Sequence, residues 1–314
     1  MEYIIGVDLG GTFIKAGPVS KQGNLLYEIS IPSQAEVSPE SVVSQITKAV
    51  KTITSKYPHD KLLGVGVGSP GLVDLDGGTV KYPPNFKNWT VFRLGDETSK
   101  STGVRVEVEN DANAAAVGEL KFGAARSFPD FIMVTLGTGV GGGVVIGGKV
   151  FRGQSGGAGE IGHITINFEG PQCNCGNRGC VEAYVGQRYL SQRVSDQLIF
   201  HHDSLINRLI DSGVEHLEPK IISQAAEQGD SFALEVWKET GMYVGVAIAS
   251  AFNLFDISTA VIGGGVAKAG KPLFDAITET VKLRVLSPLR PMVKVVPAAL
   301  ENSGILGAAA LIAE

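Results

Sequence analysis

Apolar residues in the first part of the chain form short runs separated by tight turns, which is the pattern of β-strands. YIIGVD at 3–8 is one such run, GGT follows as a turn, and FIKAGPVS returns as a second strand in a meander that continues into LLYEISI. LLGVGVGS at 62–69 and VRVEVEN at 104–110 predict two further buried strands. The order restarts at residue 131, where FIMVTL precedes the turn GTGVGG and the hairpin sequence GVVIGGKVF. This repetition predicts two related α/β domains that face one another.

Helical patterns lie between the predicted strands. Ser38 and Pro39 have the character of an N-cap and a first helical residue. Apolar residues then recur at helical spacing, at Val42, Val43, Ile46, Ala49, Val50 and Ile53. An alanine-rich helix is expected from Ala112, and we place the domain boundary near it. Residues 1–114 and 299–314 are expected to form a small N-terminal domain, and 115–298 a larger C-terminal domain.

Composition describes an ordinary globular protein. The 314 residues are 44% hydrophobic and 19% charged, with a net charge of -5, which favours two domains and offers no basic face for nucleic acid. The longest nearly apolar run, YVGVAIASAFNLF at 243–255, has the length of a buried helix and is too short to span a bilayer. The N-terminus lacks the basic region of a secretion signal. We therefore expect a cytoplasmic enzyme that binds neither nucleic acid nor membranes.

Glycine is the compositional outlier, with 41 residues out of 314, and it clusters where the backbone turns sharply or approaches a ligand. Gly66, Gly68 and Gly71 spell G-x-G-x-x-G, but Pro70 and LVDLDGG do not open the helix that a dinucleotide fingerprint needs. The run from Gly137 has the glycine spacing of protein kinases, yet H-R-D, D-F-G and A-P-E are absent from the sequence. A P-loop pattern is also absent.

The two Gly-Thr turns, at residues 10–12 and 137–139, favour phosphate binding. Successive backbone N–H groups can converge there on an anion, and Thr12 and Thr138 each add a hydroxyl donor. Asp8, at the end of the first strand, is placed to hold hydrated Mg²⁺. The alternative is that each turn only closes a hairpin.

All three cysteines lie within CNCGNRGC at 173–180. Three thiols are one short of either two disulfides or a tetrahedral metal site, and in a cytoplasmic chain such a cluster indicates metal more than disulfide.

Five segments, taken in order, resemble a known family. DLGGTFIKAG, ENDANAAAVGE, LGTGVGGGVVIGGKVFRG, GEIGH and CNCGNRGCVE are similar to the ROK family of bacterial sugar kinases, and most to its ATP-dependent glucokinases. The resemblance extends from Ile4 to ALENSGILGAAAL near the C-terminus. It implies the actin-like ATPase fold, also called ribonuclease H-like, with two α/β domains around a cleft.

The resemblance also implies a structural Zn²⁺ held by a closed Cys₃His set, which is His163, Cys173, Cys175 and Cys180. His163 is the nearest histidine upstream of the cysteines, and zinc on one ring nitrogen would orient the imidazole towards the sugar. The alternative is a group of unrelated reduced thiols.

A sugar site is implied on dispersed polar residues: Ser69, Gly71, Asn85, Asn110, Asp111, Glu160, His163 and Glu182. Asp111 is the implied general base, which takes the proton of the sugar 6-hydroxyl. From the residues alone, a helix N-cap is the favoured explanation of Asn110 and Asp111, and the two roles are compatible. The implied ATP contacts are Gly10, Gly11, Thr12, Lys15, Gly137, Thr138, Gly139, Gly264 and Gly265, with Asp8 near Mg²⁺.

Two other functions remain open. A sibling kinase would act on N-acetylmannosamine, N-acetylglucosamine, fructose or mannose, because loop shape reads the 2-position of the sugar. A sugar-sensing repressor shares this fold but carries an added N-terminal helix-turn-helix, whereas the first strand is expected here from residue 3. The family implies a homodimer or homotetramer, and polyphosphate is an alternative donor to ATP.

Overall fold

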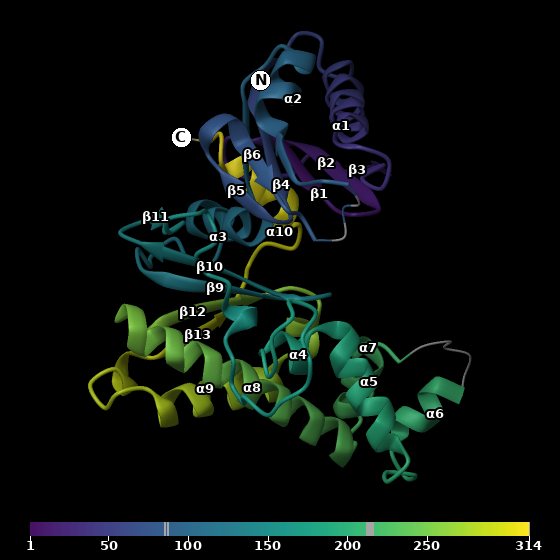
Figure 1. Ribbon diagram of the computed structural model, residues 1–314, viewed down its shortest axis with the longest axis vertical. Helices are drawn as coiled ribbons and strands as arrows, with labels where there is room; N and C mark the ends of the chain where they lie inside the picture. The colour runs from purple at the N-terminus through teal and green to yellow at the C-terminus, as the bar shows by residue number, and fades with distance from the viewer. Residues whose placement is uncertain (85, 87, 212–216, 314) are drawn as a thin grey trace. The chain divides into compact units, whose positions relative to one another are not determined.

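The computed structural model describes residues 1–84, 86, 88–211 and 217–313 (Figure 1). The chain divides into two compact units. Unit 1 comprises Met1–Pro129, Gly143–Ala158 and Ala299–Glu314, and unit 2 comprises Asp130–Gly142 and Gly159–Ala298. The expected domains, 1–114 with 299–314 and 115–298, stay a prediction.

Unit 1 is built on a five-stranded sheet with the order β3-β2-β1-β4-β8. Its strands are β1 (Glu2–Leu9), β2 (Phe13–Ser20), β3 (Ile29–Pro32), β4 (Lys61–Ser69) and β8 (Val106–Asn110). β1, β2 and β3 form the predicted antiparallel meander, while β4 runs parallel to both β1 and β8. The third strand is shorter than LLYEISI predicts. Leu26 donates its N–H to the carbonyl of Pro18 at 3.0 Å, but Pro18 has no N–H to donate in return, which interrupts the ladder.

Helices cover both faces of this sheet: α1 (Pro39–Thr54) and α2 (Leu94–Thr102) on one, α3 (Asp111–Phe122) and α10 (Ser303–Ala310) on the other. Ser38 caps α1 as predicted, accepting the N–H of Ser41 at 3.2 Å. Side chains of β1 alternate between the two faces of the sheet and so contribute to two separate apolar cores. Tyr3, Ile5 and Val7 lie in the core that includes the apolar residues of α1, whereas Ile4 packs with residues of α10.

The last helix lies directly against the first strands. α10, drawn in yellow in Figure 1, packs on β1, β4 and α3. A Cβ atom on Gly6 would overlap the carbonyl oxygen of Ile305, and one on Gly66 that of Ala308. Glycine at these two positions is therefore what allows the α10 backbone to approach the sheet.

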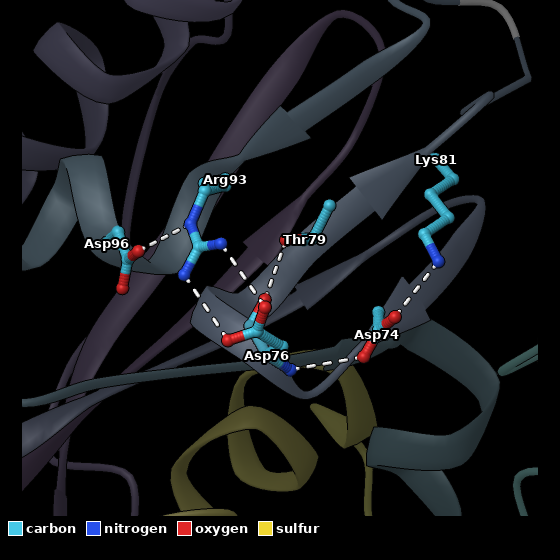
Figure 2. Close-up of polar contacts among 6 residues, drawn as sticks. All are labelled: Asp74, Asp76, Thr79, Lys81, Arg93 and Asp96. Carbon is cyan, nitrogen blue, oxygen red and sulfur yellow. Dashed lines mark hydrogen bonds and ion pairs between the residues drawn. The ribbon is translucent and has the colours of Figure 1, made fainter.

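A smaller sheet in unit 1 has the order β5-β6-β7. Its elements are β5 (Leu72–Asp74), β6 (Thr79–Lys81) and β7 (Val91–Arg93), with the 3₁₀ turn η1 (Asp76–Gly78). Figure 2 shows Arg93 between Asp76 and Asp96, with its Nε 2.6 Å from Asp96 Oδ2 and its Nη1 3.2 Å from Asp76 Oδ2. Exposed ion pairs of this kind contribute little free energy, and within the turn itself Asp76 donates its N–H to Asp74 Oδ1 at 3.1 Å.

A second five-stranded sheet has the order β11-β10-β9-β12-β13. Its strands are β9 (Phe131–Leu136), β10 (Val140–Ile146), β11 (Lys149–Val150), β12 (Thr259–Gly263) and β13 (Lys294–Pro297). β9 and the β10–β11 hairpin confirm the predicted second strand, turn and hairpin.

The helices of unit 2 are α4 (Glu182–Val185), α5 (Gln187–Leu198), α6 (Leu205–Asp211), α7 (Pro219–Glu227), α8 (Ser231–Phe255) and α9 (Lys271–Arg284), with 3₁₀ turns η2 (Ile161–His163), η3 (Val266–Ala269) and η4 (Arg290–Met292). The apolar run 243–255 lies in α8, which packs along α9 and is largely buried, as expected. None of the helices in the described part of the chain has the length and apolarity needed to cross a membrane.

Candidate functional site

Polar residues gather at one edge of the unit 1 sheet. Asp8, Ser69 and Asn110 stand at or next to the C-terminal ends of β1, β4 and β8, and the register pairs Asp8 with Gly68 and Ser69 with Asn110. Carboxyl ends of parallel strands meet at the same edge of a sheet, which is where ligands bind in open α/β sheets. The fold therefore brings three of the predicted site residues together.

The junction of β8 and α3 is fixed by the side chain of Asn110. Its Oδ1 accepts the N–H groups of Ala112 and Asn113 at 3.0 and 3.2 Å, and its Nδ2 donates to the carbonyl of Gly71 at 3.1 Å. Asn110 is thus the N-cap, and Asp111 is the first residue of α3 with its Oδ1 2.8 Å from the N–H of Ala112. The positive end of the helix dipole favours the ionised form of a carboxylate in this place.

Two residues next to this junction were not predicted from the sequence. The buried carboxylate of Glu109 accepts the N–H of Asn110 at 3.0 Å, and Arg152 reaches the same carboxylate at 2.7 Å. An acidic residue next to Asn110, two positions before the candidate base, was a visible signal. The burial of Glu109 and its pairing with the distant Arg152 could not be read from the sequence.

The first Gly-Thr turn, residues 10–12, connects β1 and β2. Gly10 donates to the carbonyl of Phe13 at 3.0 Å, and Ser33 donates through Oγ to the carbonyl of Gly11 at 2.7 Å. Gly11 and Thr12 are exposed. Beside the turn, burial raises the pKa of Asp8, while the positive charge of Lys15, its cross-strand neighbour, acts in the opposite direction.

Two residues of the implied sugar site, Ser69 and Gly71, lie just before β5. Ser69 is completely buried and its hydroxyl donates to the carbonyl of Pro70 at 3.1 Å. Gly71 has a φ of 93° and lies so close to Pro83 that a Cβ atom would come within 2.7 Å of the Pro83 Cα, so only glycine fits there. Asn85 lies outside the described residues.

The second Gly-Thr turn, residues 137–139, follows β9 in unit 2. Gly137 donates to the carbonyl of Gly139 at 2.9 Å, and its own carbonyl accepts the N–H of Gln187 at 2.9 Å. β12 runs parallel to β9, pairing Gly263 with Thr135, and Gly264 with a φ of 94° follows it. Gly264 approaches the Leu136 backbone so closely that a Cβ atom would overlap it. Gly264 and Gly265 therefore lie beside this turn.

The four predicted metal ligands form one cluster. The ligand atoms of His163, Cys173, Cys175 and Cys180 all lie within 4.8 Å of one another. Cys175 Sγ is 3.7 Å from Cys180 Sγ, and Cys173 Sγ is 3.8 Å from His163 Nδ1. A tetrahedral zinc ion with bonds of about 2.3 Å to sulfur requires about 3.8 Å between sulfur atoms. The donor set and its spacing therefore fit a four-coordinate metal.

Two carboxylates lie next to this cluster. Glu160 Oε2 is 4.0 Å from His163 Nε2, so the imidazole nitrogen that faces away from the thiols faces this acid. Burial raises the pKa of Glu160, His163 opposes that shift, and the negative charge of Glu182 adds to it. Glu182 Oε2 accepts the N–H of Val140 at 2.9 Å, and its Oε1 lies 3.8 Å from Cys173 Sγ. Glu182 thus connects the second Gly-Thr turn with the cluster.

Comparison with known proteins extends over the whole chain. The sequence profile of the ROK family matches residues 4–314. Glucokinase of Thermotoga maritima is 37% identical over 99% of this chain and 97% of its own. The crystal structure of a ROK family glucokinase from Streptomyces griseus, in complex with glucose and AMPPNP, has a TM-score of 0.85 and 37% identity, and the match covers 98% of each chain.

Repressors are also similar to this chain. The xylose repressor of Caldicellulosiruptor bescii is 30% identical over 90% of this chain, and the match covers 70% of the repressor.

Proposed function

Because this chain belongs to the ROK family, we propose that it catalyses the ATP-dependent phosphorylation of glucose at the 6-hydroxyl. The observation that carries the proposal is the 37% identity to a glucokinase along nearly the whole length of both chains. The family and the actin-like ATPase fold predicted from the sequence are confirmed by the same comparisons. A sugar and ATP are the corresponding small-molecule substrates.

Asp111 is proposed as the general base. Its carboxylate accepts the proton of the sugar 6-hydroxyl as the hydroxyl oxygen forms a bond to the γ-phosphorus and the bond to the β-phosphate oxygen breaks, releasing ADP. The position of Asp111 at the start of α3 supports this role, because a helix N-terminus interacts favourably with negative charge. Asn110, bound to the carbonyl of Gly71, is proposed to contact the sugar together with Ser69, Gly71 and Asn85.

The two Gly-Thr turns are proposed to hold ATP phosphates, with Gly264 and Gly265 next to the adenosine. Gly11 and Thr12 are exposed at the end of β1, where their N–H groups are placed to bind an anion. Asp8 would hold hydrated Mg²⁺, and Lys15 adds a positive charge on the neighbouring strand. The metal would neutralise charge that develops on the phosphates.

The cluster of His163, Cys173, Cys175 and Cys180 is proposed as a structural zinc site. Its four protein donors would complete a tetrahedral coordination, which is typical of structural rather than catalytic zinc. Since Nδ1 of His163 faces the thiols and Nε2 faces Glu160, the metal would fix this imidazole for contact with the sugar. Glu160 and Glu182 are proposed acceptors for sugar hydroxyls. A site that binds hydroxyls rejects sugars that leave its acceptors unpaired.

The proposal is tested by ADP release from the zinc-replete protein with Mg-ATP and saturating sugar. Glucose is compared with N-acetylmannosamine, N-acetylglucosamine, fructose and mannose, and polyphosphate with ATP. The fastest saturable turnover on glucose is the expected result. A different preferred sugar would indicate a sibling kinase.

A sugar-binding repressor is the second candidate, supported by the 30% identity to a xylose repressor. Sugar binding without turnover of any of the five sugars would favour it. A homodimer or homotetramer is the proposed assembly, which sedimentation of the purified protein tests directly.

A further inference from the structure

Unit 1 buries a carboxylate beside the proposed base. Glu109 is the residue before Asn110 in β8, and its side chain is 2% exposed. An ionised group in the interior is costly unless it is paired and hydrogen-bonded. The groups that contact the Glu109 carboxylate therefore indicate its role.

Both oxygens of the Glu109 carboxylate contact donors from the protein. Oε2 lies 2.7 Å from both Nε and Nη2 of Arg152. Oε1 accepts the N–H of Asn110 at 3.0 Å and Nδ2 of Asn113 at 3.2 Å. A carboxylate with four such donors has no free acceptor for a substrate. Glu109 consequently acts through its neighbours.

One of these neighbours, Asn110, is a proposed sugar contact and directly precedes the proposed base, Asp111. Asn110 is held at its N–H by Glu109 and at its side chain by Gly71 and the first turn of α3. Asn113, which is 2% exposed, lies one turn further along α3. Arg152 belongs to the loop after β11, and its carbonyl accepts the N–H of Ala158 at 3.1 Å. The pair thus joins the β8–α3 junction to residues 152–158.

We propose that Glu109 and Arg152 are positioning residues that fix Asn110 and Asp111 for proton transfer. This inference rests on the proposed role of Asp111 as base. A buried ion pair is weak support for stability, because apolar residues of similar volume often replace such pairs at no cost. Placement of a reacting group is different, since a displacement of about 1 Å reduces rates on the order of 10²-fold. The contribution of the Glu109–Arg152 pair is therefore the positioning of Asn110 and Asp111.

The experiment compares four proteins with the wild type in kcat, KM for ATP and thermal midpoint. Arg152→Met removes the guanidinium and leaves Glu109 buried without its cation. Arg152→Lys keeps the charge with a single donor group. The double variant Glu109→Met with Arg152→Met keeps the volume and removes both charges. Arg105→Met is the matched control, because Arg105 pairs with Glu107 in the same segment at 2.9 Å but is exposed.

We expect kcat of Arg152→Met to fall on the order of 10²-fold with KM for ATP unchanged, and Arg152→Lys to recover part of the loss. The double variant should regain thermal midpoint relative to Arg152→Met, because no charge is left unpaired, while its kcat stays low. The Arg105→Met control should match the wild type.

The inference is overturned if Arg152→Met keeps the wild-type kcat. It is also overturned if kcat of the double variant recovers together with its midpoint, since the pair would then only stabilise the fold. If Arg152→Met does not fold, the double variant decides alone. A wild type that turns over none of the sugars would overturn the proposed function, and this inference with it.

Discussion

Asp8 stands in surroundings that oppose its ionised form. Burial raises the pKa of Asp8 above its ordinary value of 3.8; Lys15 lowers it and the charge of Glu28 adds to the rise. A raised pKa means that the folded state favours the protonated acid. This contribution to stability is complete below pH 3.8 and is lost as the pH rises through the folded-state pKa. At pH 7 the ionised Asp8 therefore destabilises the fold.

The first prediction follows from the destabilising effect of ionised Asp8 at pH 7. Asp8→Asn should raise the free energy of unfolding at pH 7 by about 1 kcal/mol, with a smaller gain as the pH approaches 3.8, and should lower kinase activity because a proposed Mg²⁺ ligand is lost. Thermal unfolding in Mg²⁺-free buffer at both pH values measures the gain. Glu36→Gln, at an exposed position and not among the charges that shift Asp8, is the control, with a change within about 0.5 kcal/mol. Equal stability of Asp8→Asn and wild type at pH 7 would contradict the assignment.

The second prediction concerns the proposed base. Asp111→Asn keeps the shape of the side chain but cannot accept the proton, so kcat should fall about 10²–10⁴-fold while glucose still binds. Steady-state kinetics and a glucose titration measure the two properties separately. Retained turnover would remove Asp111 from the role of base.

Which residues lie together was predictable only where the relevant neighbours are close in sequence. The Cys/His cluster lies within a short segment, so its four members could be grouped before the structure was known. The Glu109–Arg152 pair joins residues 43 positions apart. The pattern of VRVEVEN predicts a buried strand, but it does not show that the Glu109 carboxylate itself is buried or which cation reaches it.

Among the elements, the segment from η2 to α4 carries the third prediction. Removal of zinc should abolish glucose binding before unit 1 unfolds, because His163 would lose the ligand that orients it while the core of α1 and β1 contains none of the metal ligands. Glucose titration and thermal unfolding of a verified metal-free sample test this order. Unchanged glucose affinity without metal would refute the connection through His163.

The contact between α10 and the first sheet carries the fourth prediction. Gly66→Ala places a Cβ atom onto the carbonyl oxygen of Ala308, and such overpacking typically costs about 1–3 kcal/mol. Denaturant unfolding measures the loss. Gly64→Ala on the same face of β4 is the matched control, since its Cβ atom would lie 3.1 Å from the nearest atoms. Equal losses in the two variants would show that α10 is not held by this contact.

At the scale of the whole molecule, the sequence predicted the repeated strand and turn order because each repeat is local. β1 to β2 and β9 to β10 were both recognisable from their apolar runs. The two compact units, in contrast, are not continuous segments of the chain. Unit 1 includes Gly143–Ala158 and Ala299–Glu314, and no composition change marks these returns. Their places depend on packing between distant segments, which hydrophobic patterning does not encode.

One of these returns is secured by a buried acid. The carboxylate of Glu119, completely buried in α3, accepts the N–H groups of Ala124, Ala299 and Leu300 at 2.6, 3.1 and 2.9 Å. Ala299 is where the chain re-enters unit 1. This carboxylate therefore fixes the segment that leads into α10.

The return of α10 has a consequence for synthesis on the ribosome. Translation proceeds from the N-terminus, so β1 and β4 leave the exit tunnel long before the helix that covers one of their faces. Until residues 299–310 emerge, the apolar surface at Ile4 and the carboxylate of Glu119 lack the partners that this segment supplies. A ribosome stalled within unit 2 would consequently present an incomplete unit 1, which is the kind of nascent chain that chaperones bind.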